Sequence, residues 1–254
     1  REQEHEAHFG KLDAGRLSPA QETAEGRLAF ELMITMGYDA MAIGNHEFEY
    51  GHEIFAWQKN RAPFPVLGAN FFYKDTDHPY AQSHAIIERD GIRIGVIGIM
   101  GQDAVSAIIP SFIAPLDVTV PAEAVQRSVD ELRDEVDLVV LLTHQGKTAP
   151  MQTDAESDPR LQRDIDADIK LAGAVTGVDV LFAGHADAGT PEPVVHSETG
   201  TIIMQTYGQA THLGYLQLTL DTESREITGH SGRLIPVEIV EAKTRWHDQD
   251  TVQT

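Results

Sequence analysis

Three short polar clusters, each holding a histidine, stand directly after apolar runs of the chain. They are Gly44-Asn45-His46-Glu47-Phe48-Glu49-Tyr50-Gly51, Thr143-His144-Gln145-Gly146 and Gly184-His185-Ala186-Asp187. Imidazole nitrogens together with amide and carboxylate oxygens form a ligand set that suits Zn, Mn, Fe or a similar divalent ion. A single histidine at the end of a strand can serve only to bond a loop carbonyl, but three such clusters favour one shared metal site.

The candidate metal ligands combine two imidazoles with two oxygen donors. The sequence has no cysteine, so thiolate ligands are excluded and a purely structural zinc site is disfavoured. Because Asn45 is uncharged, it suits a position between a metal ion and a phosphate oxygen, where further negative charge would repel the substrate. The predicted ligands are Asn45, His144, His185 and Asp187.

His46 is predicted to have a different role from its neighbour Asn45. Adjacent side chains diverge, so His46 is not expected to bind the same ion. We expect it to protonate the leaving alkoxide of a phosphate ester, or to stabilise the charge at phosphorus as a cation. Glu49, three residues further on, is close enough in a turn to hold the His46 imidazole. Glu47 is expected to be structural or to support the site from behind.

Alternation of helices and strands is expected to bring the three clusters to one edge of a sheet. Apolar residues recur at helical spacing in three segments, and each segment leads into an apolar strand that ends at a histidine cluster. The pairs are 23–36 with 40–46, 121–136 with 136–144, and 161–175 with 178–183. Strand tips of open α/β sheets are where ligands bind, so we predict a layered α/β sheet with the site at that edge.

Other segments are expected to complete the sheet. Asp90-Gly91 is a strong two-residue hairpin signal, and the later part of the chain favours an antiparallel meander without helices. Asp39, Asp137 and Asp179 lie near strand starts, away from the site, and are expected to cap backbone groups or face solvent. The predicted segments are a helix at 52–60, strands at 66–71, 85–89 and 92–99, and meander strands at 201–205, 213–220 and 226–237.

Length, composition and charge narrow the classes of protein. The chain has 254 residues, of which 41% are hydrophobic and 23% charged, enough for one large or two small domains with a sizeable core. Its formal net charge is −21, which argues against a nucleic-acid polymer or an anionic membrane as a partner. No apolar run approaches the roughly 20 residues that a membrane-spanning helix needs.

The same residues resemble, in order and spacing, the motifs of the calcineurin-like metallophosphoesterases. The Gly-Asn-His-Glu motif at 44–47 and the two later strands that end at His144 and His185 carry the likeness. It is a likeness to the catalytic amino-terminal domain of the 5′-nucleotidase and 2′,3′-cyclic nucleotide phosphodiesterase branch. The predicted domain organisation has three parts: an irregular segment at 1–22, a metallophosphoesterase domain at 23–237, and a linker or helix at 238–254.

This resemblance implies an α/β fold, a four-layer α/β/β/α sandwich that holds two divalent ions. Asn45, His144 and His185 would be metal ligands. Asp187 stands where the family has a further ligand, usually His and in some members Gln, and its carboxylate can bind the same ion.

The resemblance also implies an activity, that of a phosphoric ester hydrolase. His46 would match the catalytic histidine of the family and Glu49 its acidic partner. Metal-activated water would attack a small phosphate ester, a nucleotide or a cyclic nucleotide, while His46 assists the leaving group. The same likeness implies nucleotide catabolism in a periplasmic, cell-surface or secreted location.

Two features that the resemblance leads us to expect are not found in the sequence. No Asp-x-His occurs before Asn45, and Arg16 stands where the family has a bridging aspartate, with Asp13 as the nearest carboxylate. We expect the chain to be incomplete at its amino-terminal end. The alternative is a catalytically inactive binding domain on the same scaffold, which has lost part of its metal site.

Overall fold

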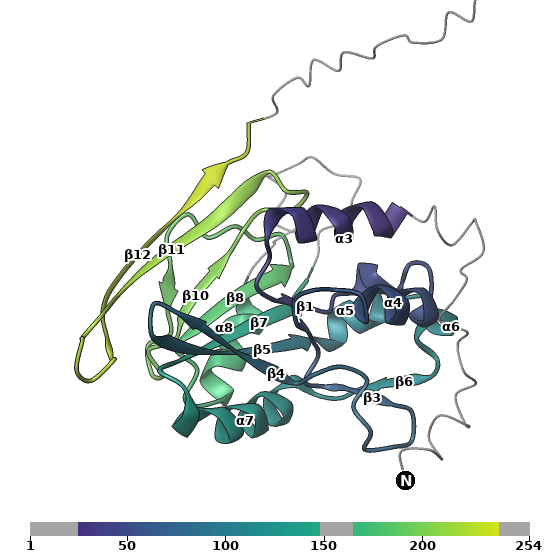
Figure 1. Ribbon diagram of the computed structural model, residues 1–254, viewed down its shortest axis with the longest axis horizontal. Coiled ribbons are helices and arrows are strands. Elements are labelled where there is room, and N and C mark those ends of the chain that lie inside the picture. Colours follow the sequence, from purple (N-terminus) through teal and green to yellow (C-terminus); the bar gives the residue numbers. More distant parts are fainter. Residues whose placement is uncertain (1–24, 148–164, 239–254) are drawn as a thin grey trace, which may run out of the picture.

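A computed structural model describes residues 25–147 and 165–238, which surround one central sheet of six strands (Figure 1). In their order across the sheet the strands are β4 (His84–Arg89), β5 (Ile92–Met100), β7 (Leu138–Gln145), β8 (Val180–His185), β10 (Ile202–Gln205) and β9 (Val194–Val195). The four inner strands run parallel, and β4 and β9 pair antiparallel at the two edges. The segment predicted at 1–22 lies outside the described residues, and so does the segment predicted at 238–254 except for Glu238.

The sheet forms where the sequence carries its apolar runs. β5 is buried from Gly95 to Met100, as expected for an inner strand covered on both faces. Asp90 and Gly91 join β4 to β5 with φ values of 51° and 77°, the left-handed conformations that a two-residue hairpin requires. The predicted hairpin is therefore confirmed. Because β5, β7 and β8 are parallel, their carboxyl ends meet at one edge of the sheet.

Two helices, α7 (Pro121–Leu132) and α8 (Asp166–Ala174), cover one face of the sheet. The strand residues that pack beneath them occupy alternate positions, because successive side chains of a strand point to opposite faces. These residues are Ile97 and Ile99 of β5, Val139 and Leu141 of β7, Leu181 of β8 and Ile203 of β10. Burying an aliphatic side chain of this size stabilises the fold by about 1.5–3 kcal/mol. Both predicted helices are confirmed, and a 3₁₀ turn, η2 (Arg133–Glu135), follows α7.

The opposite face carries a second β layer and then more helices. β1 (Met41–Ala42) pairs in parallel with β2 (Val66–Leu67). Gly98 of β5 lies so close to Leu67 that an added Cβ would stand 2.5 Å from it. α3 (Glu25–Met36) and α4 (His52–Lys59) lie outside this pair and contribute Phe30 and Phe55 to a second apolar core. Figure 1 shows α3 and α4 on one side of the central sheet and α7 on the other.

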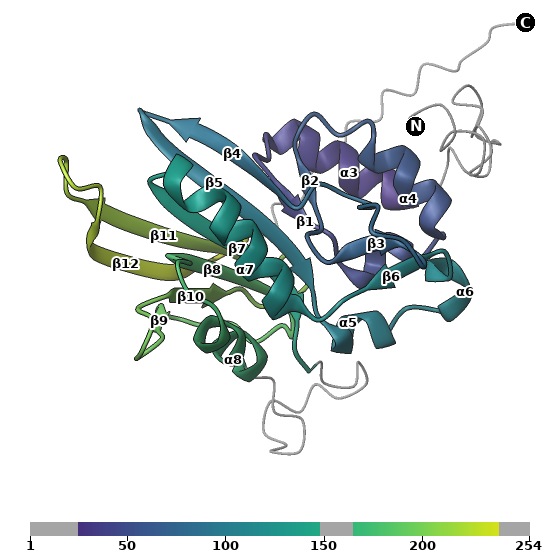
Figure 2. The ribbon, with the colours of Figure 1, turned by 90° about the horizontal axis from the view of Figure 1, so that it is seen from below.

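A long antiparallel hairpin of β11 (His212–Leu220) and β12 (Ile227–Pro236) belongs to the same second layer. Gly232 of β12 lies against Met204 of β10, whose side chain alternates with Ile203 and so faces away from α7 and α8. The turn of this hairpin lies at the far end of the molecule from α6 (Pro110–Ile113) (Figure 2). The order helix, sheet, second β layer, helix confirms the predicted four-layer α/β/β/α fold for the described residues.

Three strand predictions need correction. The segment at 201–205 is β10, which pairs in parallel with β8 inside the central sheet, so the predicted meander is wrong for this strand. The strand expected at 40–46 stops at Ala42, and a 3₁₀ helix, η1 (Asn45–Phe48), follows it. The strand expected at 66–71 is divided between β2 and β3 (Phe71–Tyr73), which pairs with β6 (Leu116–Val118). None of the three changes moves the histidine clusters from the expected edge.

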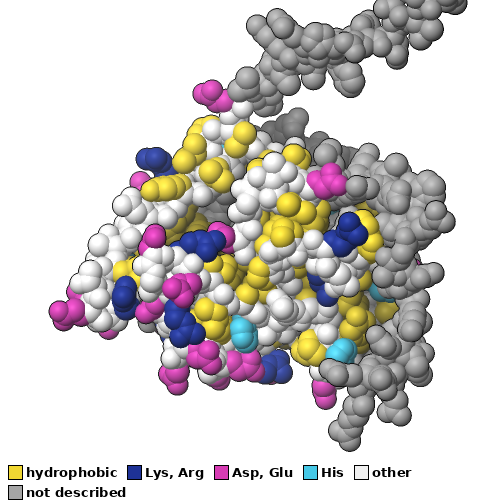
Figure 3. Space-filling view, viewed as in Figure 1, with side chains coloured by type: hydrophobic (Ala, Val, Ile, Leu, Met, Phe, Trp, Pro, Cys, Tyr) yellow, Lys and Arg dark blue, Asp and Glu magenta, His cyan; other side chains and the backbone are white. Residues whose placement is uncertain are grey.

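The described helices and one face of the surface can be compared with the charge and apolar content of the sequence. Among the helices that the structure describes, none has both the length and the apolar character needed to cross a membrane. On the face seen in Figure 3, the described Lys and Arg side chains are interspersed with Asp and Glu and form no continuous basic patch. A nucleic-acid polymer would find little electrostatic attraction on that face.

Candidate metal centre

Neighbouring parallel strands bring His144 and His185 together. β7 and β8 are in register so that His144 pairs with Gly184 and Gln145 with His185. The two imidazole rings stand with their centroids 4.8 Å apart. This contact follows directly from the strand pairing, since each apolar run ends at the same edge of the sheet.

Asn45 completes a group of three donors at this edge. Its Oδ1 lies 2.7 Å from His144 Nε2 and 3.1 Å from His185 Nδ1, and the residue is buried. Gly44 allows this approach, because a Cβ at that position would stand 2.8 Å from the His144 ring. One amide oxygen and two imidazole nitrogens, drawn from three separate parts of the chain, therefore converge on a common point.

The surroundings keep both imidazoles of this group neutral. Burial lowers the pKa of His144 to about 3, with the neighbouring His185 and His46 adding to the effect. Burial also lowers the pKa of His185. A neutral imidazole retains a lone pair on one ring nitrogen, which is the form that binds metal ions. The donor chemistry of Asn45, His144 and His185 thus fits a divalent cation.

The backbone at the β8 tip is unusual. His185 has a φ of 76° and Asp187 a φ of 56°, both in the left-handed region that side chains other than glycine rarely adopt. Such conformations cost on the order of 1 kcal/mol each and occur preferentially at functional sites. The Asp187 carboxylate lies against Gly208, where an added Cβ would stand 2.4 Å from it. Within the described residues, the side chains of His144, His185 and Asp187 do not come together as ligands of one metal ion. Ligation by Asp187 therefore stays a prediction.

His46 lies beside this group and faces outward. η1 carries its side chain, which is 71% exposed, and its Nδ1 forms a short contact with Oε1 of Glu49. The other ring nitrogen, Nε2, is therefore the atom at which a proton could be exchanged with a substrate. Glu47 accepts a hydrogen bond of 2.6 Å from the Gly44 backbone N–H, which agrees with its expected structural role. Burial raises the pKa of Glu47.

Comparison with known proteins finds relatives and solved structures that cover most of this chain. The 5′-nucleotidase of Vibrio cholerae is 28% identical over 234 residues, which cover 87% of this chain and 42% of the relative. A solved 5′-nucleotidase precursor from Thermus thermophilus covers 85% of this chain and 42% of its own, with a TM-score of 0.67 and 24% identity. The calcineurin-like phosphoesterase YfkN from Bacillus subtilis covers 92% of this chain and 72% of its own, with a TM-score of 0.66 and 19% identity. No family model matches the chain.

Over most of its length the chain is similar to 5′-nucleotidases, and it has the fold of the calcineurin-like phosphoesterases. It spans less than half the length of the curated relatives that it matches. The resemblance drawn from the sequence motifs is therefore confirmed for the fold and the branch.

This phosphoesterase domain also holds a buried carboxylate that the sequence analysis missed. Asp168 of α8 is fully buried, and its Oδ1 accepts hydrogen bonds from Thr143 Oγ1 at 2.6 Å and Gln145 Nε2 at 2.9 Å. The two donors flank His144 on β7. Asp168 thus holds the strand tip that presents the ligand. A signal was available, because Ile165 and Leu171 stand three residues before and after Asp168 and place it on the inward face of the helix.

The free oxygen of Asp168 adds an electrostatic feature beneath the metal centre. Within the described residues its Oδ2 is buried and has no hydrogen-bond partner. Burial raises the pKa of Asp168 to about 6, although the bonds from Thr143 and Gln145 oppose the rise. A carboxyl in such a place is easier to keep protonated than an exposed one.

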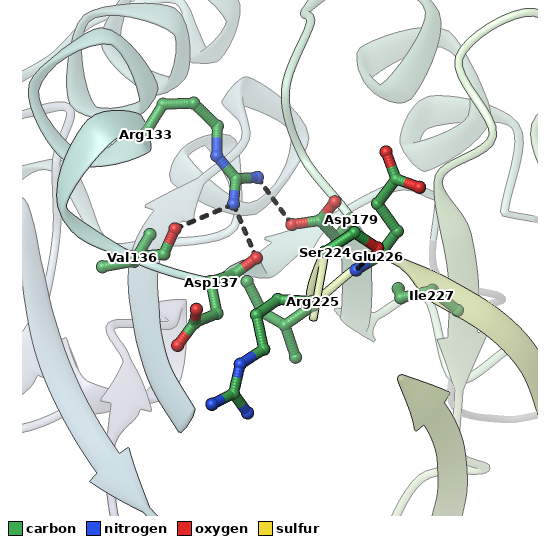
Figure 4. A pocket seen from close by; sticks show the side chains of 9 residues that line it. Arg133, Val136, Asp137, Asp179, Ser224, Arg225, Glu226 and Ile227 are labelled. Carbon is green, nitrogen blue, oxygen red and sulfur yellow. Dashed lines mark hydrogen bonds and ion pairs between the residues drawn. The ribbon is translucent and has the colours of Figure 1, made fainter. Parts of the chain in front are cut away.

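At the other end of the sheet, a pocket of about 310 Å³ is bordered by Arg133, Asp137 and Asp179 (Figure 4). The guanidinium of Arg133 donates to Asp179 Oδ2 at 2.7 Å and to the carbonyls of Val136 and Asp137 at 3.1 and 2.7 Å. Asp179 Oδ2 also accepts a bond of 2.7 Å from the Val139 backbone N–H. These residues cap strand starts, as predicted for Asp137 and Asp179, and Arg133 is already occupied by them.

Proposed function

We propose that this chain hydrolyses the phosphate esters of nucleotides with the help of two divalent metal ions. The observation that carries the proposal is the convergence of the buried Asn45 oxygen with two neutral, partly buried imidazoles, His144 and His185. A buried polar group of this kind is costly unless it is paired, and a bound cation would pair all three donors at once. Asp187 is proposed as a further ligand.

The metal ions would act as Lewis acids and lower the pKa of a bound water. Asn45, His144 and His185 would hold one ion, and Asn45 would also keep the phosphoryl group in place. No group of three or more His, Asp or Glu that could hold a second ion is found among residues 25–147 and 165–238.

His46 has the position required of a proton donor to the leaving group. In the overall reaction a water oxygen bonds to phosphorus, the ester P–O bond breaks, and the leaving oxygen takes a proton from His46 Nε2. Glu49 bonds Nδ1 of the same ring and so fixes its orientation and tautomer. Proton transfer from a positioned side chain contributes roughly 10²–10⁴-fold to such reactions.

The proposals for the substrate and the location rest on the names of the related proteins. Two of the matched curated proteins, from Vibrio cholerae and Vibrio vulnificus, are named 5′-nucleotidase, which favours a nucleotide over other small phosphate esters. We propose a periplasmic, cell-surface or secreted protein that acts in nucleotide catabolism. The alternative of a catalytically inactive binding domain gains no support from these names, and the retained His46 and Glu49 pair argues against it.

The test is metal analysis together with hydrolysis of a nucleoside 5′-monophosphate and a generic aryl phosphate. We expect two ions per chain, activity that a chelator removes, and loss of activity in both His46→Ala and Asn45→Ala. His230→Ala on the exposed surface of β12 is the matched control and should retain full activity. Full activity in His46→Ala and Asn45→Ala would overturn the assignment of the site, and a chain that neither binds metal nor hydrolyses any ester would overturn the function.

A further inference from the structure

We propose that a pocket beside α7 binds a small organic carboxylate whose remaining part is apolar. This pocket is separate from the proposed metal centre, because Asn45, His144 and His185 are not among the residues that line it. Its volume is about 390 Å³, within the range of small-molecule sites. One wall is α7 from 127 to 131, and the other is the segment 79–84, which leads into the edge strand β4.

A buried hydroxyl lines this pocket without a protein partner. Ser128 is 2% exposed and lies on the inward face of α7, one turn from Ala124 and from Leu132, where the other buried positions of the helix are apolar. Within the described residues the Ser128 hydroxyl has no hydrogen-bond partner. A buried polar group is costly to leave unpaired, so a ligand oxygen that accepts this O–H would satisfy it.

The same helix presents a guanidinium to the pocket. Arg127 is exposed at the rim, and no residue in the described part of the chain forms an ion pair or a hydrogen bond with its side chain. Glu131 stands four residues further along α7, at a spacing that allows an ion pair, but its carboxylate lies 3.8 Å from His84 Nδ1 instead. The parallel N–H groups of a guanidinium match the two oxygens of a carboxylate. Arg127 is therefore available to bind an anion of this shape.

His84 adds a third donor from the opposite wall. Its Nδ1 lies 3.0 Å from Ser83 Oγ and 3.8 Å from a carboxylate oxygen of Glu131, and among residues 25–147 and 165–238 no group bonds to Nε2. When the Ser83 hydroxyl donates to Nδ1, the ring hydrogen stands on Nε2, which can then donate to a ligand. A hydroxyl, a guanidinium and an imidazole thus line one pocket, and this set of donors suits an oxyanion.

The charges of the lining permit a bound anion. The ionisable groups that line the pocket are Arg127, Glu131 and His84. Their sum is zero when the His84 ring is neutral and positive when it is protonated, so a carboxylate meets no net negative charge there. The chain as a whole has a formal net charge of −21, but the repulsion from distant acidic residues is screened within about 10 Å at 0.1 M salt.

The rest of the lining is mainly apolar and favours a ligand with an apolar body. Ala69 and Ala81 are buried, while Phe72 is half-buried and Pro79 is exposed. A ring placed against Phe72 and Pro79 would remove apolar surface from water on both partners. Acetate or inorganic phosphate could reach the donors but would leave this wall uncovered. An aromatic carboxylate such as benzoate uses both parts of the pocket.

The test is a titration of the purified chain with benzoate, followed by NMR of its alanine methyl groups. Ala69 and Ala81 report on the pocket, and Ala186, next to His185, reports on the proposed metal centre. We expect benzoate to shift the Ala69 and Ala81 signals and to leave Ala186 unchanged. Benzyl alcohol keeps the ring without the charge, and acetate keeps the charge without the ring, so each should bind at least about fivefold more weakly than benzoate. Inorganic phosphate should bind as weakly as acetate.

Two substitutions examine the donors separately. Arg127→Gln removes the positive charge and should weaken benzoate binding by about tenfold, and Ser128→Ala removes one neutral donor and should weaken it by about threefold. Both variants should fold, because Arg127 is exposed and alanine favours a helix. Arg225→Gln is the matched control, since it removes an arginine from the turn between β11 and β12 and should leave benzoate binding unchanged.

Each result decides the proposal. Unshifted Ala69 and Ala81 signals, or a shift of Ala186 alone, would overturn the carboxylate site. Benzyl alcohol binding as tightly as benzoate would mean that the donors are not used, and acetate or phosphate binding as tightly would mean that the apolar wall is not used; either result overturns the proposal. Unchanged benzoate affinity in Arg127→Gln overturns it as well. None of these measurements requires metal binding or hydrolysis, so the proposed function is tested independently.

Discussion

The polar groups at the two ends of the central sheet differ in how completely they are paired with charges and hydrogen-bond partners. At the amino ends of β7 and β8, Asp179 accepts bonds from Arg133 and from the Val139 backbone, and Arg133 also donates to backbone carbonyls. Arg133 and Asp179 are thus paired with each other and with backbone groups. This arrangement contributes to the fold.

At the carboxyl ends, the same strands present polar groups whose hydrogen-bonding capacity is not fully used by other groups of the protein. Two imidazoles are held neutral around one amide oxygen, His185 adopts a left-handed φ of 76°, and Asp168 has an unpaired buried oxygen. Each feature costs stability, and sites that serve a function commonly retain such costs. The difference teaches that one end of the sheet contributes to folding, whereas the other carries the groups proposed to bind a cation and its substrate.

The sharpest test of this contrast is His144→Ala. It removes one of the proposed ligands, so we expect metal binding to weaken greatly and hydrolysis to fall by roughly 10³-fold, while the free energy of unfolding of the metal-free protein changes by less than about 1 kcal/mol. Metal titration, kinetics and urea unfolding measure the three quantities. His230→Ala, on the exposed surface of β12, serves as the control. If the metal-free variant unfolds under conditions where the wild type stays folded, His144 is needed for stability, and the proposed difference between the two ends of the sheet is wrong.

Asp168 gives the next largest effect, and its sign can be worked out. Burial raises its pKa to about 6 in the folded state from an ordinary value of 3.8, so between these pH values the folded protein binds more protons than the unfolded chain. This group therefore makes stability decrease as pH rises from about 4 to 6, by at most about 3 kcal/mol. Asp168→Asn should remove that dependence.

The measurement for Asp168 is a comparison of urea unfolding at several pH values. His144 acts in the opposite direction, because its lowered pKa makes stability increase as pH rises from about 3 to 6.5. The difference between Asp168→Asn and the wild type cancels the histidine contribution and isolates Asp168. If that difference is constant from pH 4 to 6.5, Asp168 is not a titrating buried acid.

At the opposite end, Asp179→Ala should affect stability alone. It leaves Arg133 and the Val139 backbone N–H without their acceptor, and because Asp179 is partly exposed we expect a loss of about 2 kcal/mol in the free energy of unfolding. For a chain of this size that corresponds to a decrease in Tm of roughly 4–8 °C. Its kcat/KM at a temperature where it is folded should match the wild type. A selective loss of activity without a change in Tm would contradict the division between the two ends.

Much of this contrast could be predicted from the sequence. The apolar runs that end at His144 and His185 determine that parallel neighbours share an edge, and the pairing then brings the two rings to 4.8 Å. Residues 202–205 were assigned wrongly, because a short apolar run does not reveal which strand it pairs with. The 3₁₀ helix at Asn45–Phe48 also escaped prediction, since it depends on Gly44 packing against the distant His144. The pocket between α7 and the segment 79–84 could not be predicted either, because its walls lie far apart in sequence.

Glu49 offers the smallest expected effect and tests how finely the carboxyl end is organised. Its side chain is 57% exposed, so Glu49→Gln should leave Tm unchanged. The amide still accepts a bond from His46 Nδ1 but carries no charge, and we expect kcat to fall by about tenfold with KM nearly constant. Glu53→Gln on α4 is the control. An unchanged kcat in Glu49→Gln would mean that the charge of Glu49 plays no part in the action of His46.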